Sequence, residues 1–388
     1  MQANLPAIGT QYVLEVPALA QLIASLERRG YRVVGPTLRG PAIVYDILTS
    51  LEDLPAGLTA DQETGTYRIR KRNDGALFGY AVGPQGWKRF LHPAEVRLFE
   101  ARRDGRGFEI VEDGHPPPRY AFLGMRSCEL AAMAIQDHVL LGEQFGDPVY
   151  RKRRQGIFLV AVNCTVAAPT CFCGSMHTGP PAEASFDIAL TELVGPGRHL
   201  FIAEAGSRVG SDVLGELGPV EASAELRQEA EKAIRDAMAS LKRKVNTKGL
   251  REVLYDGFEH PHWDDVAARC LTCANCTMVC PTCTCTTVED VSDVSGIRAE
   301  RWRKWDSCFT QSFSYIHGGS VRMSSKSRYR QWVTHKFAAW IDQFGSSGCV
   351  GCGRCIAWCP AGIDITEELA ALREPPAAAA PNHARSVL

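Results

Sequence analysis

The sequence has little net charge, no long apolar run and no apparent secretion signal. Its 388 residues include 43 Lys or Arg and 44 Asp or Glu, a formal charge of −1, so the total charge does not favour a nucleic acid or an anionic membrane as partner. No window approaches 18 uninterrupted apolar residues, which predicts that no helix spans a membrane. Residues 1–6 lack a basic stretch followed by an apolar core, so we expect no signal peptide.

Cysteine, in contrast, is abundant, with 15 residues. Without a signal peptide, we expect a reducing, cytoplasmic compartment in which thiols are free to hold iron. Two runs near the C-terminus share the pattern C-x2-C-x2-C-x3-C-P. The first run is Cys270, Cys273, Cys276, Cys280 and Pro281, and the second is Cys349, Cys352, Cys355, Cys359 and Pro360. Bacterial ferredoxins hold [4Fe–4S] clusters with this pattern.

The spacing predicts which thiolates share a cluster. Three cysteines at intervals of three, on a tight loop, reach three corners of one cubane, whereas the fourth follows after the chain has entered a helix. In two-cluster ferredoxins this fourth cysteine ligates the other cluster. We therefore expect two [4Fe–4S] clusters, one held by Cys270, Cys273, Cys276 and Cys359, and one held by Cys349, Cys352, Cys355 and Cys280. A pair of four-cysteine zinc sites is the alternative, although zinc usually takes two separated pairs of ligands.

The alternation of patterns along the chain predicts an α+β fold, in which a mixed α/β N-terminal and middle region precedes an α-helical dicluster ferredoxin module. We expect five segments: a mixed α/β block over 1–119, an α/β block over 120–221, a helical linker over 222–269, the ferredoxin module over 270–373, and a disordered tail over 374–388.

Local periodicity predicts individual elements within these segments. Helices are expected over 14–29 and 129–141, a helix start at 92–95, and a long amphipathic helix over 222–245 that bridges to the ferredoxin module. Strand-like patterns occur at 31–34, 42–47, 66–70, 76–82, 87–91, 121–124, 156–163 and 199–203. Helical patterns at 301–307 and 329–344, between the two cysteine runs, favour the α-helical type of dicluster ferredoxin.

Four more cysteines follow predicted strands in the middle of the chain: Cys128, Cys164, Cys171 and Cys173. Because function in an α/β sheet gathers at strand ends, these four thiols predict a third [4Fe–4S] cluster. Their spacing is less diagnostic than that of the ferredoxin runs. One alternative is that Cys128 and Cys164 are buried as small apolar residues. Another is a four-cysteine zinc site.

Three cysteines remain, namely Cys283, Cys285 and Cys308. They are either buried thiols near the clusters or alternative or additional ligands of iron.

Several motifs occur in an order that narrows the choice among protein families. They are Arg126-Ser-Cys128-Glu129, Asn163-Cys164-Thr165, Cys171-Phe-Cys173-Gly-Ser-Met176, Cys280-Pro-Thr-Cys283, Trp305-Asp306-Ser307-Cys308 and the second ferredoxin run. Over about residues 120–370 the chain resembles the beta subunit of the cytoplasmic sulfhydrogenases, which are NAD(P)-linked [NiFe] hydrogenases. That family is closely related to one component of anaerobic sulfite reductase.

The resemblance implies an electron-transfer subunit with two or three [4Fe–4S] clusters. It would lie between a flavin subunit that exchanges electrons with NAD(P)H and the small and large subunits of a [NiFe] hydrogenase. The residues agree with this, because we find no catalytic group: no nicotinamide fingerprint, no Ser/His/Asp signature and no nickel-type pair of C-x2-C motifs. The stretch 83–86 lacks the G-x-G-x-x-G spacing and is typical of a turn.

Three other functions stay open at this point. One is the equivalent relay of a sulfite or polysulfide reductase. Another is a self-sufficient oxidoreductase whose α/β block binds flavin, and the last is a zinc-bearing interaction module.

Overall fold

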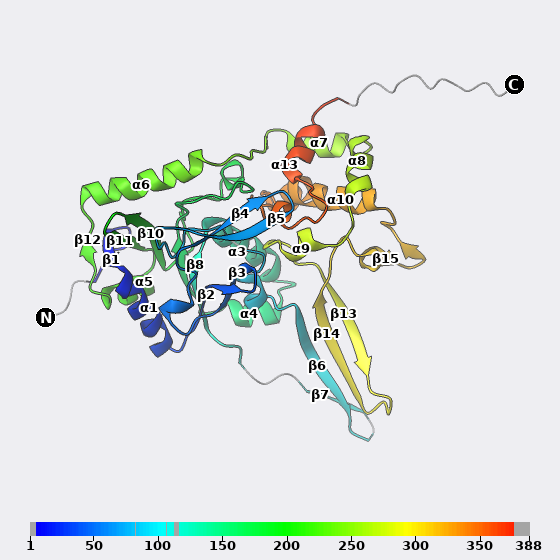
Figure 1. Ribbon diagram of the computed structural model, residues 1–388. Helices are drawn as coiled ribbons and strands as arrows, with labels where there is room; N and C mark the ends of the chain where they lie inside the picture. Colours follow the sequence, from blue (N-terminus) through cyan, green and yellow to red (C-terminus); the bar gives the residue numbers. More distant parts are fainter. Residues whose placement is uncertain (1–4, 82, 106, 112–115, 376–388) are drawn as a thin grey trace.

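The computed structural model describes residues 5–81, 83–105, 107–111 and 116–375. Most of the predicted tail, from residue 376 on, and residue 82 of one predicted strand lie outside this range. Mixed α and β structure extends over the described chain, as predicted (Figure 1). None of the described helices is long and apolar enough to cross a membrane.

An eight-stranded sheet forms the body of the molecule. Its order is β12 (Val220–Glu221), β1 (Gln11–Glu15), β11 (Arg198–Ala205), β10 (Ile188–Gly195), β9 (Phe158–Val162), β8 (Tyr120–Met125), β2 (Arg32–Arg39) and β3 (Ala42–Ile47). The four strands β10, β9, β8 and β2 run parallel, and the outer pairs are antiparallel. Strands β8 and β9 are apolar and buried along their whole length, as central parallel strands are. The sheet takes strands from both sides of residue 119, so it crosses the expected boundary between the first two blocks.

Helices cover both faces of this sheet. The helix α1 (Val16–Arg28) packs with α5 (Arg208–Gly215) on one face, and α3 (Ser127–Leu140) packs with α4 (Pro148–Arg154) on the other. The helix expected over 14–29 is thereby confirmed as α1, although Leu14 itself lies in β1. The helix α6 (Ala224–Ala239) lies along β10 and β11. The predicted bridging helix therefore ends before residue 245, and residues 241–247 have no regular structure.

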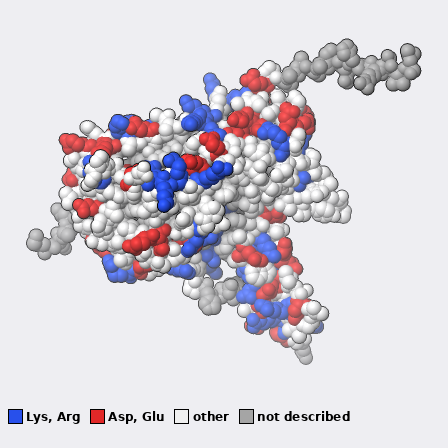
Figure 2. Space-filling view, in the orientation of Figure 1, with Lys and Arg blue, Asp and Glu red and all other residues white. Residues whose placement is uncertain are grey.

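A four-stranded antiparallel sheet projects from the body (Figure 1). Its order is β13 (Thr286–Ser292), β14 (Arg298–Trp305), β6 (Glu95–Arg103) and β7 (Phe108–Val111). Side chains of both charges intermingle on its surface, whereas the neighbouring hairpin of β15 (Tyr315–Ile316) and β16 (Gly319–Ser320) is uncharged in the same view (Figure 2). This sheet joins strands from the N-terminal block to strands that lie between the two cysteine runs.

The structure corrects four predictions in and near the projecting sheet. The helix predicted over 301–307 is wrong, because β14 pairs with β13 on one side and β6 on the other, and such ladders override a weak local helical pattern. The predicted helix start at 92–95 is wrong, because β6 begins at Glu95. The strand predicted over 87–91 is instead the short helix α2 (Lys88–Leu91), and residues 76–81 of the next predicted strand have no regular structure.

The C-terminal part is mainly helical around an aromatic core of Trp263, Phe309, Tyr329, Trp332 and Phe337. Its helices are α7 (Leu250–Asp256), α8 (His262–Arg269), α9 (Asn275–Met278), α10 (Ser325–Thr334), the π-helical η4 (His335–Ala339), α11 (Trp340–Phe344), α12 (Arg354–Ala357) and α13 (Ile365–Ala371). The helical pattern predicted over 329–344 is confirmed as α10, η4 and α11.

Smaller elements complete the fold. They are the hairpin of β4 (Leu58–Glu63) and β5 (Thr66–Lys71), and the 3-10 turns η1 (Leu51–Asp53), η2 (Cys173–Met176) and η3 (Gln311–Ser314). The β4–β5 hairpin packs on the second cysteine run, where Gly65 N donates to Ile356 O over 3.0 Å. Tyr67 and Trp358 add a ring contact at 5.0 Å between centroids. The N-terminal block thus supports the C-terminal cysteines directly.

Candidate metal centres

The two cysteine runs share one backbone conformation. Thr272 and Gly351 occupy equivalent positions with φ of 50° and 63°, and Ala274 and Gly353 follow with φ of 66° and 72°. Each loop then enters a one-turn helix, α9 or α12. Non-glycine residues in the left-handed region persist only where the surroundings require it, at a cost of about 1–3 kcal/mol each. The first run therefore holds its loop shape without the help of glycine.

Backbone amides of these loops point at cysteine sulfurs. Thr272 N donates to Cys270 Sγ and Gly351 N donates to Cys349 Sγ, each over 3.4 Å. Ile363 N donates to Cys359 Sγ over 3.4 Å. Hydrogen bonds of this kind stabilise the thiolate form, which is the form that binds metal.

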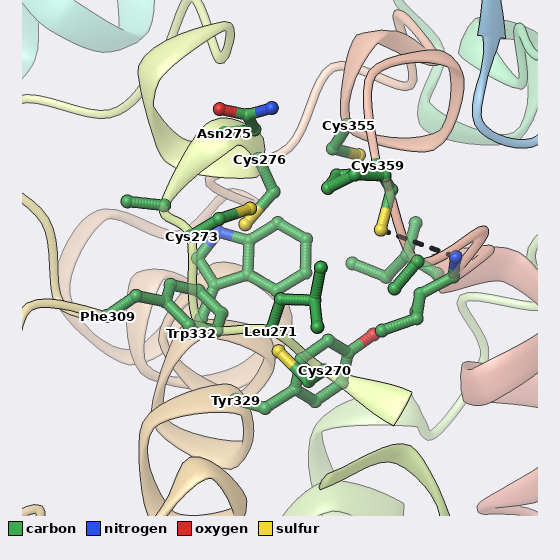
Figure 3. Close-up of a pocket in the computed structure, with 15 residues that line it drawn as sticks. Cys270, Leu271, Cys273, Asn275, Cys276, Phe309, Tyr329, Trp332, Cys355 and Cys359 are labelled. Atoms are coloured by element: carbon green, nitrogen blue, oxygen red, sulfur yellow. Dashed lines mark hydrogen bonds between the residues drawn. The ribbon is translucent and has the colours of Figure 1, made fainter. Parts of the chain in front are cut away.

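One pocket collects the first predicted ligand set. Cys270, Cys273, Cys276 and Cys359 line it together with Cys355 and the aromatic side chains of Phe309, Tyr329 and Trp332 (Figure 3). Burial raises the pKa of the Cys276 thiol, and Cys270 and Cys359 raise it further by repulsion between thiolates. The chain thus brings Cys359, the fourth cysteine of the second run, to the first three cysteines of the first run. This is the crossed arrangement that the spacing predicts.

The second predicted set also gathers in one place. Burial raises the pKa of Cys355, and the next causes are the thiolates of Cys349, Cys352 and Cys280. Burial likewise raises the pKa of Cys349 to about 12. Cys280 therefore lies close to all three other cysteines of the second set, and its charge also acts on Cys276 of the first.

The middle cysteines come together at the carboxyl ends of two parallel strands. Cys128 lies in the first turn of α3, after β8, and Cys164 follows β9. Burial, together with the charge of Cys164, raises the pKa of Cys171 to about 12. Cys173 lies close enough to Cys171 for its pKa to be raised in the same way. A bulge at Gly124, where φ is 90°, shifts the register of β8 just before this site.

The loop of the middle cysteines packs directly on the second run. Phe172 N donates to Gly351 O over 2.8 Å, and Thr178 Oγ1 donates to Val350 O over 2.6 Å. A Cβ on Gly351 would stand 2.7 Å from Cys173 N, and one on Gly353 would stand 2.3 Å from Thr170 O. Only glycine permits this approach, so the middle site and the second run are in contact.

Of the three remaining cysteines, Cys283 lies beside Cys280, whereas Cys285 and Cys308 lie beside each other. The Cys283 thiol makes a hydrogen bond to Cys280, and Cys285 makes one to Cys308. This bond lowers the pKa of Cys285 to about 7 although burial opposes it. Whether these three thiols ligate iron stays a prediction.

The donor sets fit iron–sulfur clusters. Several buried thiolates in one place repel one another unless cations compensate them, and four sulfurs with nearby N–H donors are what a [4Fe–4S] cluster requires. Within the described residues, no three His, Cys, Asp or Glu side chains meet closely enough for a single metal ion.

Sequence reasoning missed the buried cations of the site. Arg354 lies inside the second run, 1% exposed, while Lys88 and Lys336 are 6% and 5% exposed. The sequence could have revealed Arg354, because it is a charged residue between two predicted ligand cysteines. No local signal marks the two lysines, since Lys88 lies 192 residues before Cys280 and Lys336 lies 56 residues after it.

Comparisons with known proteins agree with this geometry. A family model described as a 4Fe-4S dicluster domain matches residues 269–363, which contain both cysteine runs. Sulfhydrogenase 2 subunit beta of Pyrococcus furiosus is 32% identical over 293 residues, which cover 74% of this chain and 82% of the relative. No solved structure matches the chain.

Proposed function

The chain belongs to the family of sulfhydrogenase beta subunits, and on that basis we propose that it carries electrons between a [NiFe] hydrogenase and a flavin subunit. Membership and the dicluster domain together make it an iron–sulfur electron-transfer subunit of a hydrogenase-type, multi-subunit complex. The proposal adds the partners: a subunit that takes electrons from NAD(P)H, and the small and large hydrogenase subunits. We place this complex in the cytoplasm, where thiols stay reduced.

The proposed ligands are those that the spacing predicts. Residues 270–373 form an α-helical ferredoxin module in which each cluster takes three cysteines from one run and the fourth from the other. The shared pocket of Cys270, Cys276 and Cys359 supports this crossing. When bound, such clusters accept and release single electrons at potentials set by their surroundings. The chain supplies N–H donors to sulfur and an apolar wall that keeps water away.

We propose that Cys128, Cys164, Cys171 and Cys173 hold a third [4Fe–4S] cluster. The observation that carries the relay is the contact of this loop with the second run, where Phe172 donates to Gly351 over 2.8 Å. This contact supports a row of three cysteine groups with the second-run group in the middle. Short separations are what an electron relay requires, whereas a docking scaffold would have no need of them.

The assembled complex tests this function. The chain is produced with the products of its neighbouring genes, and bleaching of cluster absorption is followed after addition of NADH or NADPH without oxygen. We expect bleaching only when the flavin subunit is present, and reoxidation by protons when the hydrogenase subunits are present. Reoxidation by sulfite or polysulfide alone would contradict the hydrogenase assignment, and bound flavin in the isolated chain would contradict a pure relay.

A further inference from the structure

Lys336 reaches into the cysteine site from a helix with an irregular turn. The residue lies in the π-helical η4, between α10 and α11, and such turns are frequent at functional sites. Its own backbone carbonyl accepts from Gly348 N over 2.8 Å and from Ser347 Oγ over 3.0 Å. The backbone of Lys336 is thus held against Ser347 and Gly348, directly before the second run.

The amino group of Lys336 has three acceptors. Nζ donates to Cys280 Sγ over 3.3 Å, to Thr282 Oγ1 over 2.9 Å and to Gly348 O over 3.2 Å. Only a protonated amine has three N–H donors, so this arrangement is that of an ammonium ion.

No carboxylate of the described residues forms an ion pair with Lys336, although it is only 5% exposed. Buried charges are normally paired. The negative charge that balances Lys336 must therefore reside on the cysteine sulfurs around it and on whatever those sulfurs hold.

A second buried lysine packs against residues 280–283, the stretch that Lys336 also contacts. Lys88 Nζ donates to Cys280 O over 3.0 Å and to Cys283 O over 3.2 Å, and it stands 4.0 Å from the centroid of the Trp305 ring. Lys88 therefore adds positive charge next to Cys280, but of the two lysines only Lys336 donates to its sulfur.

Within the described chain no lysine or arginine donates a hydrogen bond to a sulfur of the first ligand set, although the charge of Arg328 acts on Cys270. The sulfurs of Cys270 and Cys359 accept from the backbone amides of Thr272 and Ile363. Apolar and aromatic side chains form most of the rest of their pocket. The two proposed clusters of the ferredoxin module thus differ in charge environment while they share their loop shape.

We propose that Lys336 is a positioning residue that makes the cluster held by Cys349, Cys352, Cys355 and Cys280 easier to reduce than the cluster of the first set. This inference rests on the proposed function, because it requires iron–sulfur clusters at these cysteines. Reduction adds one electron, and hence one negative charge, to the cluster without making or breaking a bond. An ammonium that donates to a ligand sulfur stabilises the more negative state. Of these two clusters, the one beside Lys336 would therefore hold the electron.

The test is an EPR-monitored redox titration of the full chain, purified without oxygen, as wild type and as Lys336→Met. The signal of the second set is the one that Cys349→Ser removes. We expect the ratio of reduced to oxidised cluster, at the wild-type midpoint, to fall about tenfold in Lys336→Met, which corresponds to about 59 mV for one electron. The other signals and the iron content should stay unchanged.

Two variants serve as controls. Lys336→Arg keeps the charge and should keep the midpoint near the wild-type value. Lys304→Met removes the ammonium of a much more exposed lysine in β14 and should leave the midpoints unchanged. If Lys336→Met loses its clusters, Lys336→Gln keeps N–H donors without the charge and should show the same direction of shift.

The outcomes separate this inference from the proposed function. Intact iron with an unchanged midpoint in the uncharged variants would overturn the role of Lys336 alone. Wild-type protein without iron would instead overturn the relay itself.

Discussion

Arg354 donates from Nη2 to Glu129 Oε1 over 2.7 Å, with side-chain exposures of 1% and 0%. The pair joins α12, inside the second cysteine run, to α3, which carries Cys128. Tyr45 Oη donates to the other carboxylate oxygen over 2.8 Å. The contact between the middle site and the ferredoxin module therefore includes a fully buried ion pair.

Removal of one partner of this pair should be strongly destabilising. Glu129→Ala leaves the Arg354 guanidinium buried without its counter-charge, at a cost of about 3–5 kcal/mol. We expect a clearly lower melting temperature in thermal unfolding of the oxygen-free protein. Asp236→Ala breaks the exposed pair with Lys232 and should cost less than about 1 kcal/mol. Equal melting temperatures for the two variants would show that the buried pair contributes nothing.

Cys276→Ser should impair the first ligand set. Cys276 lies in the pocket with Cys270 and Cys359, and a serine hydroxyl is a poorer ligand of iron than a thiolate. We expect loss or conversion of one cluster in EPR and interrupted electron transfer in the assembled complex. Turnover equal to wild type would rule out this cysteine as a ligand in the relay.

Cys173→Ala should remove the third cluster alone. Iron per chain should fall by about four, with the signals of the two ferredoxin clusters retained. Met176→Leu, in the same loop, conserves volume and should leave the iron content unchanged. Iron equal to wild type in Cys173→Ala would mean that the middle cysteines are structural only.

The protein should lose stability as the pH falls below about 6.5 because of His92. Burial, together with the charges of Arg303 and Lys88, lowers the pKa of His92 from its usual 6.5 to about 3. Below pH 6.5 His92 binds a proton in the unfolded chain but not in the folded chain. The free energy of unfolding therefore falls by up to about 1.4 kcal/mol for each pH unit. Above pH 6.5 this effect vanishes.

His92→Phe tests that pH dependence. Neither ring nitrogen of His92 has a hydrogen-bond partner within the described residues, so the phenyl ring removes the titration at little other cost. We expect the difference between melting temperatures at pH 7 and pH 5 to be smaller in the variant. An identical difference in both proteins would exclude His92 as the cause.

The sequence predicted the cysteine groups because ligand spacing is local. Cys270, Cys273 and Cys276 lie on one loop, and the crossing by Cys359 follows from the reach of that loop. The strands before Cys128 and Cys164 were likewise visible as short apolar runs. Parallel strands bring their carboxyl ends together, so these thiols meet.

Contacts between distant segments were beyond local patterns. The helix expected over 301–307 is a strand because β6, about 200 residues earlier, pairs with it. The approach of Gly351 to Phe172 and the reach of Lys336 to Cys280 depend on packing between segments far apart in the chain. Such contacts decide how the cysteine groups are ordered and charged, and no single stretch of sequence encodes them.

Iron, acid-labile sulfide and zinc per chain, measured on oxygen-free protein together with EPR of the reduced sample, test the central claim most directly. The relay of three cysteine groups in a row predicts about twelve irons, no zinc, and signals broadened by interaction between neighbouring clusters. About eight irons would restrict the relay to the ferredoxin module, and zinc in place of iron would contradict it.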